Sequence, residues 1–208
     1  MKQIERKTVC GCCGKEIIQT VTISRYQSDI GLDGRPTKAS ALPLIQECKY
    51  CHYCSIDLGK KISDKAKSVV MSAEYQNILK KDYADMQICK LKAAIYATED
   101  IRAKGYLYLV ICWYMEIHNL QGAIEMRRCA VNIMEELFVH GADLEEILVY
   151  IDCLRILGRM AEAQEQITAI EELIEDNFPS DNILYKRYKF EQQLVLEKDR
   201  NAHYISEV

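Results

Sequence analysis

The sequence predicts a mainly α-helical protein: a small N-terminal β module followed by antiparallel helical pairs. Two observations indicate this fold class. Six of the ten cysteines and five of the nine glycines lie before residue 60, which is typical of a loop-rich module. From Ser63 onward the spacing of apolar residues changes from two to about three and a half, which indicates helices. We therefore expect two domains, residues 1–59 and residues 60–208.

Two cysteine pairs dominate the first domain. Cys10 and Cys13 form one C-x-x-C pair, Cys48 and Cys51 form the other, and 34 residues separate Cys13 from Cys48. Two residues between the sulfurs allow a tight turn to aim both thiolates at one ion. Four thiolates suit tetrahedral Zn²⁺. The spacing therefore predicts a structural Zn²⁺ site with these four cysteines as ligands.

The residues between the pairs predict the rest of a zinc ribbon. Glu16–Ser24 is rich in β-branched residues and is expected to form a strand, with Ile17 and Gln19 on one face and Ile18 on the other. Residues 28–40 contain Asp-Gly and Arg-Pro turn signals, and the apolar segment 41–46 is expected to be a second strand. A module of this size needs metal or disulfide support to fold.

Other readings of the cysteine-rich segments stay open. The cysteines could simply pack in reduced form, or one pair could be a redox dithiol, although no βαβ pattern surrounds either pair. Cys12, His52 and Cys54 lie close to the predicted ligands in the sequence and could be bystanders or exchange with them. Gly14 follows the first pair directly and suits a left-handed backbone there.

Residues 60–208 contain a series of apolar stripes at helical spacing. Gly141 is expected to end one helix, Asp143 with Glu146 to cap the next, and the segment 179–181 to open the last one. The residues of the stripes are Ala84, Ile88, Leu91 and Ile95; Tyr106, Leu109, Val110, Trp113, Tyr114 and Ile117; Ala123, Ala130, Val131, Met134 and Phe138; Leu144, Ile147, Leu148, Ile151 and Leu154; Ala163, Ile167, Ile170 and Ile174; and Leu184, Tyr188 and Val195.

Two segments within the helical part are similar to each other. His118–Ile133 has small residues at Ala123 and Ala130, and Leu157–Leu173 has Gly158 and Ala163 in equivalent places. Both resemble the turn and second helix of a tetratricopeptide repeat, in which small residues let paired helices approach closely. The spacing between the two segments departs from the 34-residue period, and a generic antiparallel bundle is the alternative.

Charge and hydropathy restrict the possible environments. Residues 1–70 carry twelve Lys and Arg against seven Asp and Glu, a net of +5, whereas residues 71–208 carry fifteen against twenty-four, a net of −9. The start of the chain has no apolar signal segment, and no run of about 18 apolar residues suggests a membrane span. Cysteines scattered singly through helices suit a reducing compartment, so we expect a cytoplasmic protein that does not enter the membrane.

The cysteine pairs also carry a family resemblance. CGCCGKE, followed after a loop by IQECKYCHY, resembles the bacterial family known as domain of unknown function 2225. Its members show a C-x-x-C-G-K start, a later C-P-x-C-G-Y segment and tetratricopeptide-like helices. The resemblance covers most of the chain and is most specific over residues 8–55. It implies that Cys10, Cys13, Cys48 and Cys51 hold the metal, while Lys49 and His52 replace the family's Pro and Gly.

These features favour a non-enzymatic adaptor that binds a protein or peptide through its helices. The sequence has no G-x-S-x-G, Walker, H-E-x-x-H or G-x-G-x-x-G motif, and four thiolates would leave a zinc ion no open position for substrate. The alternative is nucleic-acid binding by the basic segment. The basic residues that support it are Lys2, Arg6, Lys7, Lys15, Arg25, Arg35, Lys38, Lys60, Lys61, Lys65 and Lys67.

Overall fold

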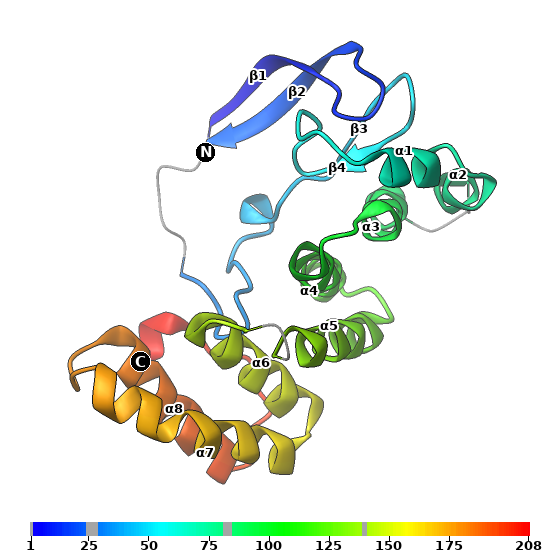
Figure 1. The fold of residues 1–208 in the computed structure, drawn as a ribbon. Coiled ribbons are helices and arrows are strands. Elements are labelled where there is room, and N and C mark those ends of the chain that lie inside the picture. The colour runs from blue at the N-terminus through cyan, green and yellow to red at the C-terminus, as the bar shows by residue number, and fades with distance from the viewer. Residues whose placement is uncertain (1, 24–28, 81–84, 139–140) are drawn as a thin grey trace.

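The computed structural model describes residues 2–23, 29–80, 85–138 and 141–208 (Figure 1). Within them, two short β-hairpins precede eight α-helices, which confirms the mainly helical class with a small N-terminal β module. The helices are α1 (Asp64–Val70), α2 (Ala73–Lys80), α3 (Met86–Ala97), α4 (Ile101–Ile117), α5 (Ala123–Phe138), α6 (Leu144–Leu157), α7 (Met160–Asn177) and α8 (Ile183–Leu196).

The first hairpin pairs β1 (Lys2–Val9) with β2 (Glu16–Ile23) in antiparallel register. The predicted strand is confirmed as far as Ile23, and Ser24 lies outside the described residues. Ile17 and Gln19 are buried while Ile18 is exposed, as the alternation predicted. The partner strand β1 was not expected, because its largely polar sequence has no strong apolar alternation.

The second hairpin is much shorter and pairs β3 (Gln46–Glu47) with β4 (Cys54–Ser55). The prediction of a strand over residues 41–46 was wrong except at Gln46, where β3 begins. Residues Ala39–Ala41 form a 3₁₀ turn, and Pro43 removes a backbone donor that a ladder would need. The Gln46 side chain joins the hairpins instead: its amide accepts from the Thr20 N–H at 2.7 Å and donates to the Thr20 carbonyl at 2.8 Å.

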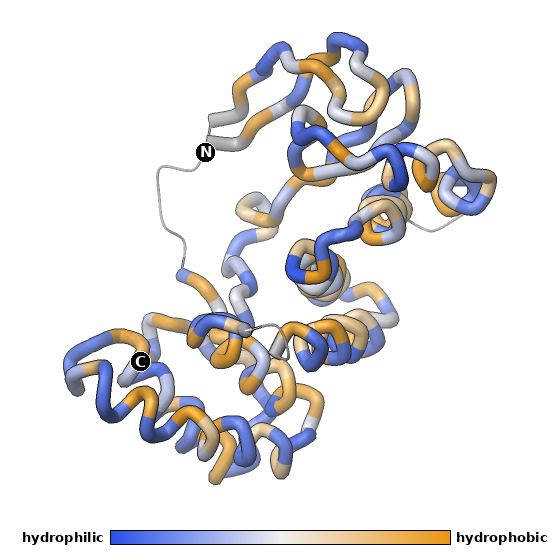
Figure 2. Tube along the Cα trace, in the orientation of Figure 1, coloured by the Kyte–Doolittle hydropathy of each residue, from blue (hydrophilic) through white to orange (hydrophobic). Residues whose placement is uncertain are grey.

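From α4 onward each helix packs against the next one in the chain: α4 with α5, α5 with α6, α6 with α7, and α7 with α8. Figure 2 shows hydrophobic and hydrophilic residues alternating along α7 and α8, as one buried face requires. Ala130 and Ala163 are fully buried. Asn119, between α4 and α5, and Gly158, between α6 and α7, both have a left-handed backbone conformation. The identification of these helical pairs as tetratricopeptide units stays a prediction.

Most members of the predicted apolar stripes line the core, but Tyr106 is 44% exposed. Ala84 and the side chain of Phe138 lie outside the described part. The Asp143 cap is confirmed: its carboxylate accepts from the Glu146 N–H at 2.9 Å, and the Glu146 carboxylate accepts from the Asp143 N–H at 3.0 Å. The last helix begins at Ile183, capped by Asn182, slightly later than the predicted opening at 179–181.

The segment 29–37, expected to be a turn-rich loop, reaches into the helical part (Figure 1). Leu32 is fully buried and Asp33 nearly so. The Leu32 N–H donates to the His203 carbonyl at 3.0 Å, and its carbonyl accepts from the Arg187 guanidinium. Asp33-Gly34 does form a turn, with Gly34 at φ +84°. The division at residue 59 stays a prediction, although a segment of the first part packs inside the second.

One cluster of buried hydrophobic residues extends from the cysteines of the β module to Val195 in α8. The two hairpins therefore share a core with the helices that follow them. None of the described helices combines the length and apolarity needed to cross a membrane.

Candidate metal centre

Each cysteine pair lies in the turn of a β-hairpin, and the two turns have the same pattern of backbone hydrogen bonds. The N–H after the second cysteine donates to the carbonyl of the first: Gly14 to Cys10 at 2.9 Å, and His52 to Cys48 at 2.8 Å. The N–H of each first cysteine donates to a carbonyl five residues later, at 2.9 Å in the first turn and 2.8 Å in the second. Both pairs of sulfurs are thus aimed by equivalent turns.

The residue after each pair adopts the left-handed conformation, with Gly14 at φ +71° and His52 at φ +62°. The glycine was expected there, and the histidine keeps the same turn without it. A non-glycine residue in this region costs about 1–2 kcal/mol. The His52 Nδ1 lies 2.7 Å from Glu47 Oε1, which holds the ring beside the turn.

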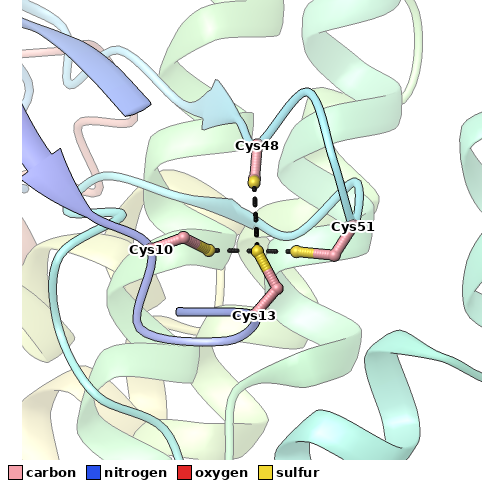
Figure 3. A group of neighbouring side chains, drawn as sticks. All are labelled: Cys10, Cys13, Cys48 and Cys51. Carbon is pink, nitrogen blue, oxygen red and sulfur yellow. Dashed lines mark hydrogen bonds between the residues drawn. The ribbon is translucent and has the colours of Figure 1, made fainter. Parts of the chain in front are cut away.

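The structure brings all four predicted ligands together (Figure 3). The four sulfurs lie within 4.8 Å of one another, with 3.8 Å between Cys10 and Cys51 and 3.8 Å between Cys13 and Cys48. A tetrahedron with Zn–S bonds of about 2.3 Å has edges of about 3.8 Å, whereas a disulfide is about 2.05 Å long. No disulfide joins any of the ten cysteines, all of which lie in the described residues. The donor set therefore fits a closed, four-coordinate metal ion.

The surroundings oppose joint ionisation of these thiols in the protein alone. Burial raises the pKa of Cys10 and of Cys51 above the ordinary value. Burial also disfavours the Cys48 thiolate, but hydrogen bonds from the backbone of Tyr50 and Cys51 outweigh it, and the pKa of Cys48 is lowered. A divalent cation would supply the positive charge that lets all four thiolates coexist.

The three neighbouring candidates lie outside this group of converging sulfurs. Cys12 is partly exposed, and burial raises its pKa. Cys54 is buried, its thiol donates to the His52 carbonyl at 3.4 Å, and burial raises its pKa to about 12. His52 faces Glu47. In this structure each of the three residues therefore lies beside the four-sulfur cluster and is not part of it.

The helices and the segment before them support both turns. Tyr75 of α2 is fully buried, and its hydroxyl donates to the His52 carbonyl at 3.1 Å and accepts from the Cys54 N–H at 2.9 Å. On the first turn, the Gly11 N–H donates to the Leu58 carbonyl at 2.8 Å, and a Cβ on Gly11 would lie 1.9 Å from the carbonyl oxygen of Lys60. Sequence reasoning missed Tyr75, because a tyrosine on an amphipathic helix looks like any other core aromatic.

Replacing Tyr75 by Phe should weaken metal binding by about 10- to 100-fold, the usual effect of losing an outer partner of a metal site. The variant leaves a buried N–H and carbonyl of the second turn without this partner, with a stability loss of about 1–3 kcal/mol. Competition with a chromophoric chelator measures the affinity. Tyr50→Phe is the matched control, because Tyr50 lies on the same turn but is 47% exposed. Equal affinities for the two variants would contradict the supporting role of Tyr75.

No protein-family model, curated protein or solved structure matches the chain. The resemblance to the domain of unknown function 2225 family stays a prediction. Conclusions on function therefore rest on the geometry of the chain itself.

Proposed function

We propose that the chain is a zinc-binding, non-enzymatic adaptor of the cytoplasm that belongs to the domain of unknown function 2225 family. Cys10, Cys13, Cys48 and Cys51 would hold one Zn²⁺ and fasten the two hairpins together. The observation that carries the zinc assignment is the convergence of four sulfurs at tetrahedral spacing. Four thiolates leave no open position for water or substrate, which favours a structural over a catalytic ion.

The adaptor role is supported by the helical part. Stacked pairs of helices offer extended surfaces for a protein or peptide, and several large apolar side chains are exposed along residues 60–208. These exposed residues are Met71, Met86, Tyr96, Tyr106, Ile124, Leu173, Ile183 and Leu196. A metal-bound β module followed by such helices would suit a protein that binds a partner and does not catalyse a reaction.

Elemental analysis and a binding assay test the two halves of this proposal. The purified chain should contain one zinc ion per molecule, and a chain purified without bound metal would contradict the zinc assignment. For the adaptor role, the immobilised zinc-loaded chain should retain a protein whose direct binding is reproduced with purified components. Repeated failure to find such a partner would count against the adaptor and leave the zinc assignment intact.

Nucleic-acid binding is a second candidate, supported by a specific arrangement at the cysteine turns. Tyr50 is 47% exposed, and the ammonium groups of Lys15 and Lys49 lie 4.6 and 5.0 Å from its ring centroid. An exposed aromatic ring flanked by cations suits base stacking and phosphate contacts. Against this, Arg35 pairs with Glu116 and Lys67 with Asp64, and Arg25 lies outside the described residues.

Fluorescence anisotropy with a single-stranded oligonucleotide separates this candidate from the adaptor. Binding through the Tyr50 site would weaken steeply with salt and would be reduced by Tyr50→Ala. Absence of binding at low salt would remove this candidate.

A further inference from the structure

The helical part contains an apolar groove of about 470 Å³, within the size range of binding sites. Helices α4, α5, α6 and α8 contribute its walls, together with the segment 30–34 and Ile205 near the C-terminus. Its main apolar residues are Leu109, Trp113, Met134, Leu137, Val149 and Ile183. The groove is large enough to receive an anchoring side chain of a partner.

The groove opens to solvent at an apolar rim. Ile30, Tyr106 and Ile183 line it, and all three residues are exposed. They come from the segment 30–34, from α4 and from α8, so only the fold brings them together. The Tyr106 ring packs edge-on against the buried Trp113 at a centroid distance of 6.0 Å. Large apolar side chains that gather around a hollow in the surface are typical of an interaction site.

Most charged groups of the lining are paired or buried. The carboxylates are Asp33, Asp143, Glu145 and Glu146, and the guanidinium groups are Arg102 and Arg187. Arg102 is offset by Glu146 at 3.4 Å. Arg187 is almost fully buried and donates to the Leu32 carbonyl, and the buried Asp33 pairs with Arg127 at 2.8 Å. Within the part of the chain that the structure describes, Asp143 and Glu145 have no ion-pair partner.

The rim is therefore acidic where water reaches it. Asp143 and Glu145 are both exposed. They lie at the start of α6, whose N-terminus carries a partial positive charge of about 0.5, and two carboxylates exceed that partial charge. Residues 71–208, which supply most of the lining, carry fifteen Lys and Arg against twenty-four Asp and Glu. The groove thus combines an apolar floor with a negative edge.

We propose that this groove takes a basic amphipathic segment of a partner protein, an inference that rests on the adaptor role proposed above. Apolar side chains of the segment would enter the groove beside Trp113, and its Lys or Arg side chains would face Asp143 and Glu145. Burial of the apolar side chains supplies most of the affinity. The carboxylates select a cationic segment and oppose an acidic one.

Three synthetic peptides test this selectivity. SKLSKFLKSLKS has apolar residues at helical spacing flanked by lysines, SELSEFLESLES replaces each lysine by glutamate, and SKSSKSSKSSKS keeps the lysines without the apolar residues. Each is titrated into the full-length chain at about 0.15 M salt, following the fluorescence of Trp113, the only tryptophan, and the heat of binding. We expect saturable binding of SKLSKFLKSLKS and at least about tenfold weaker binding of the other two. Absence of saturable binding of SKLSKFLKSLKS, or equal affinity for either other peptide, would overturn the proposal.

Two pairs of variants at exposed positions locate the peptide. Ile183→Ser should weaken binding of SKLSKFLKSLKS by about tenfold, whereas Leu196→Ser, at the other end of α8 and outside the groove, should bind like the wild type. Glu145→Lys should weaken binding by at least about threefold and strengthen binding of SELSEFLESLES. Glu172→Lys makes the same change of charge on α7 and should do neither. Equal affinities within either pair would place the peptide elsewhere and overturn the proposal.

The groove can fail while the adaptor role stands. A protein that the wild-type chain and Ile183→Ser retain equally would overturn the groove assignment and leave the adaptor role intact. Sedimentation velocity tests a second copy of the chain as the occupant. A dimer that dissociates in Ile183→Ser but not in Leu196→Ser would assign the groove to self-association and overturn the proposal.

Discussion

Replacing Cys48 by Ser should abolish stoichiometric zinc binding and unfold both hairpins while most of the helix content remains. The second hairpin has only two residues in each strand, and an isolated two-stranded hairpin is marginal in water. A structural zinc ion contributes on the order of 10–16 kcal/mol of apparent binding free energy in small modules. This is far more than the two paired positions of the second hairpin can contribute on their own. Hydrogen exchange should therefore become fast in residues 2–23 and 46–55.

The matched control is Cys129→Ser, which makes the same exchange at a partly exposed cysteine outside the sulfur cluster. It should retain one zinc ion and wild-type exchange in the hairpins. Incubation of the wild-type chain with a strong chelator should reproduce the Cys48→Ser pattern. If the chelated chain keeps slow exchange in both hairpins, the hairpins do not depend on a metal and the proposed site is wrong.

The cysteine cluster could be predicted from the sequence because its geometry is largely local. A C-x-x-C turn positions its two sulfurs through bonds within six residues, and only the meeting of the two turns is long-range. His52 shows that the local geometry does not require glycine: the residue after the second pair adopts the left-handed conformation although it is a histidine. The contact from Tyr75 depends on how α2 packs against the second turn, which no local pattern encodes.

The segment 29–37 shows where local reasoning fails. Its turn signals were read correctly, but turns are usually exposed, whereas Leu32 and Asp33 are buried. The buried Asp33 carboxylate is paired with Arg127, 94 residues further along the chain, which supplies the opposite charge. From a helical sequence pattern alone, Arg127, Arg155 and Glu191 would be predicted to face solvent, because they are charged. All three are buried. Pairs of buried charges far apart in sequence leave no periodic signal.

Replacing Arg127 by Met should destabilise the chain by about 3–5 kcal/mol, the usual effect of leaving one member of a buried ion pair without its partner. The Arg127 side chain is 2% exposed, and its guanidinium lies 2.8 Å from both the Asp33 and the Glu116 carboxylates. Without it the Asp33 carboxylate keeps the Trp113 indole and the Arg35 N–H as hydrogen-bond donors, but no other side chain of opposite charge among the described residues lies at hydrogen-bond distance. Urea denaturation of the zinc-loaded chain measures the loss.

The neighbouring residue offers the control. Arg128→Met removes the same side chain from the same helix, but Arg128 is 58% exposed and pairs with Glu125 on the surface, so the change should be within about 1 kcal/mol. The double variant Asp33→Asn with Arg127→Met should recover part of the loss, because it removes the buried charge together with its partner. The single Arg127 variant should also become sensitive to proteolysis within residues 29–37, since that ion pair holds the segment among the helices. Equal stabilities of the Arg127 and Arg128 variants would mean that apolar burial of Leu32, rather than charge pairing at Asp33, keeps the segment in place.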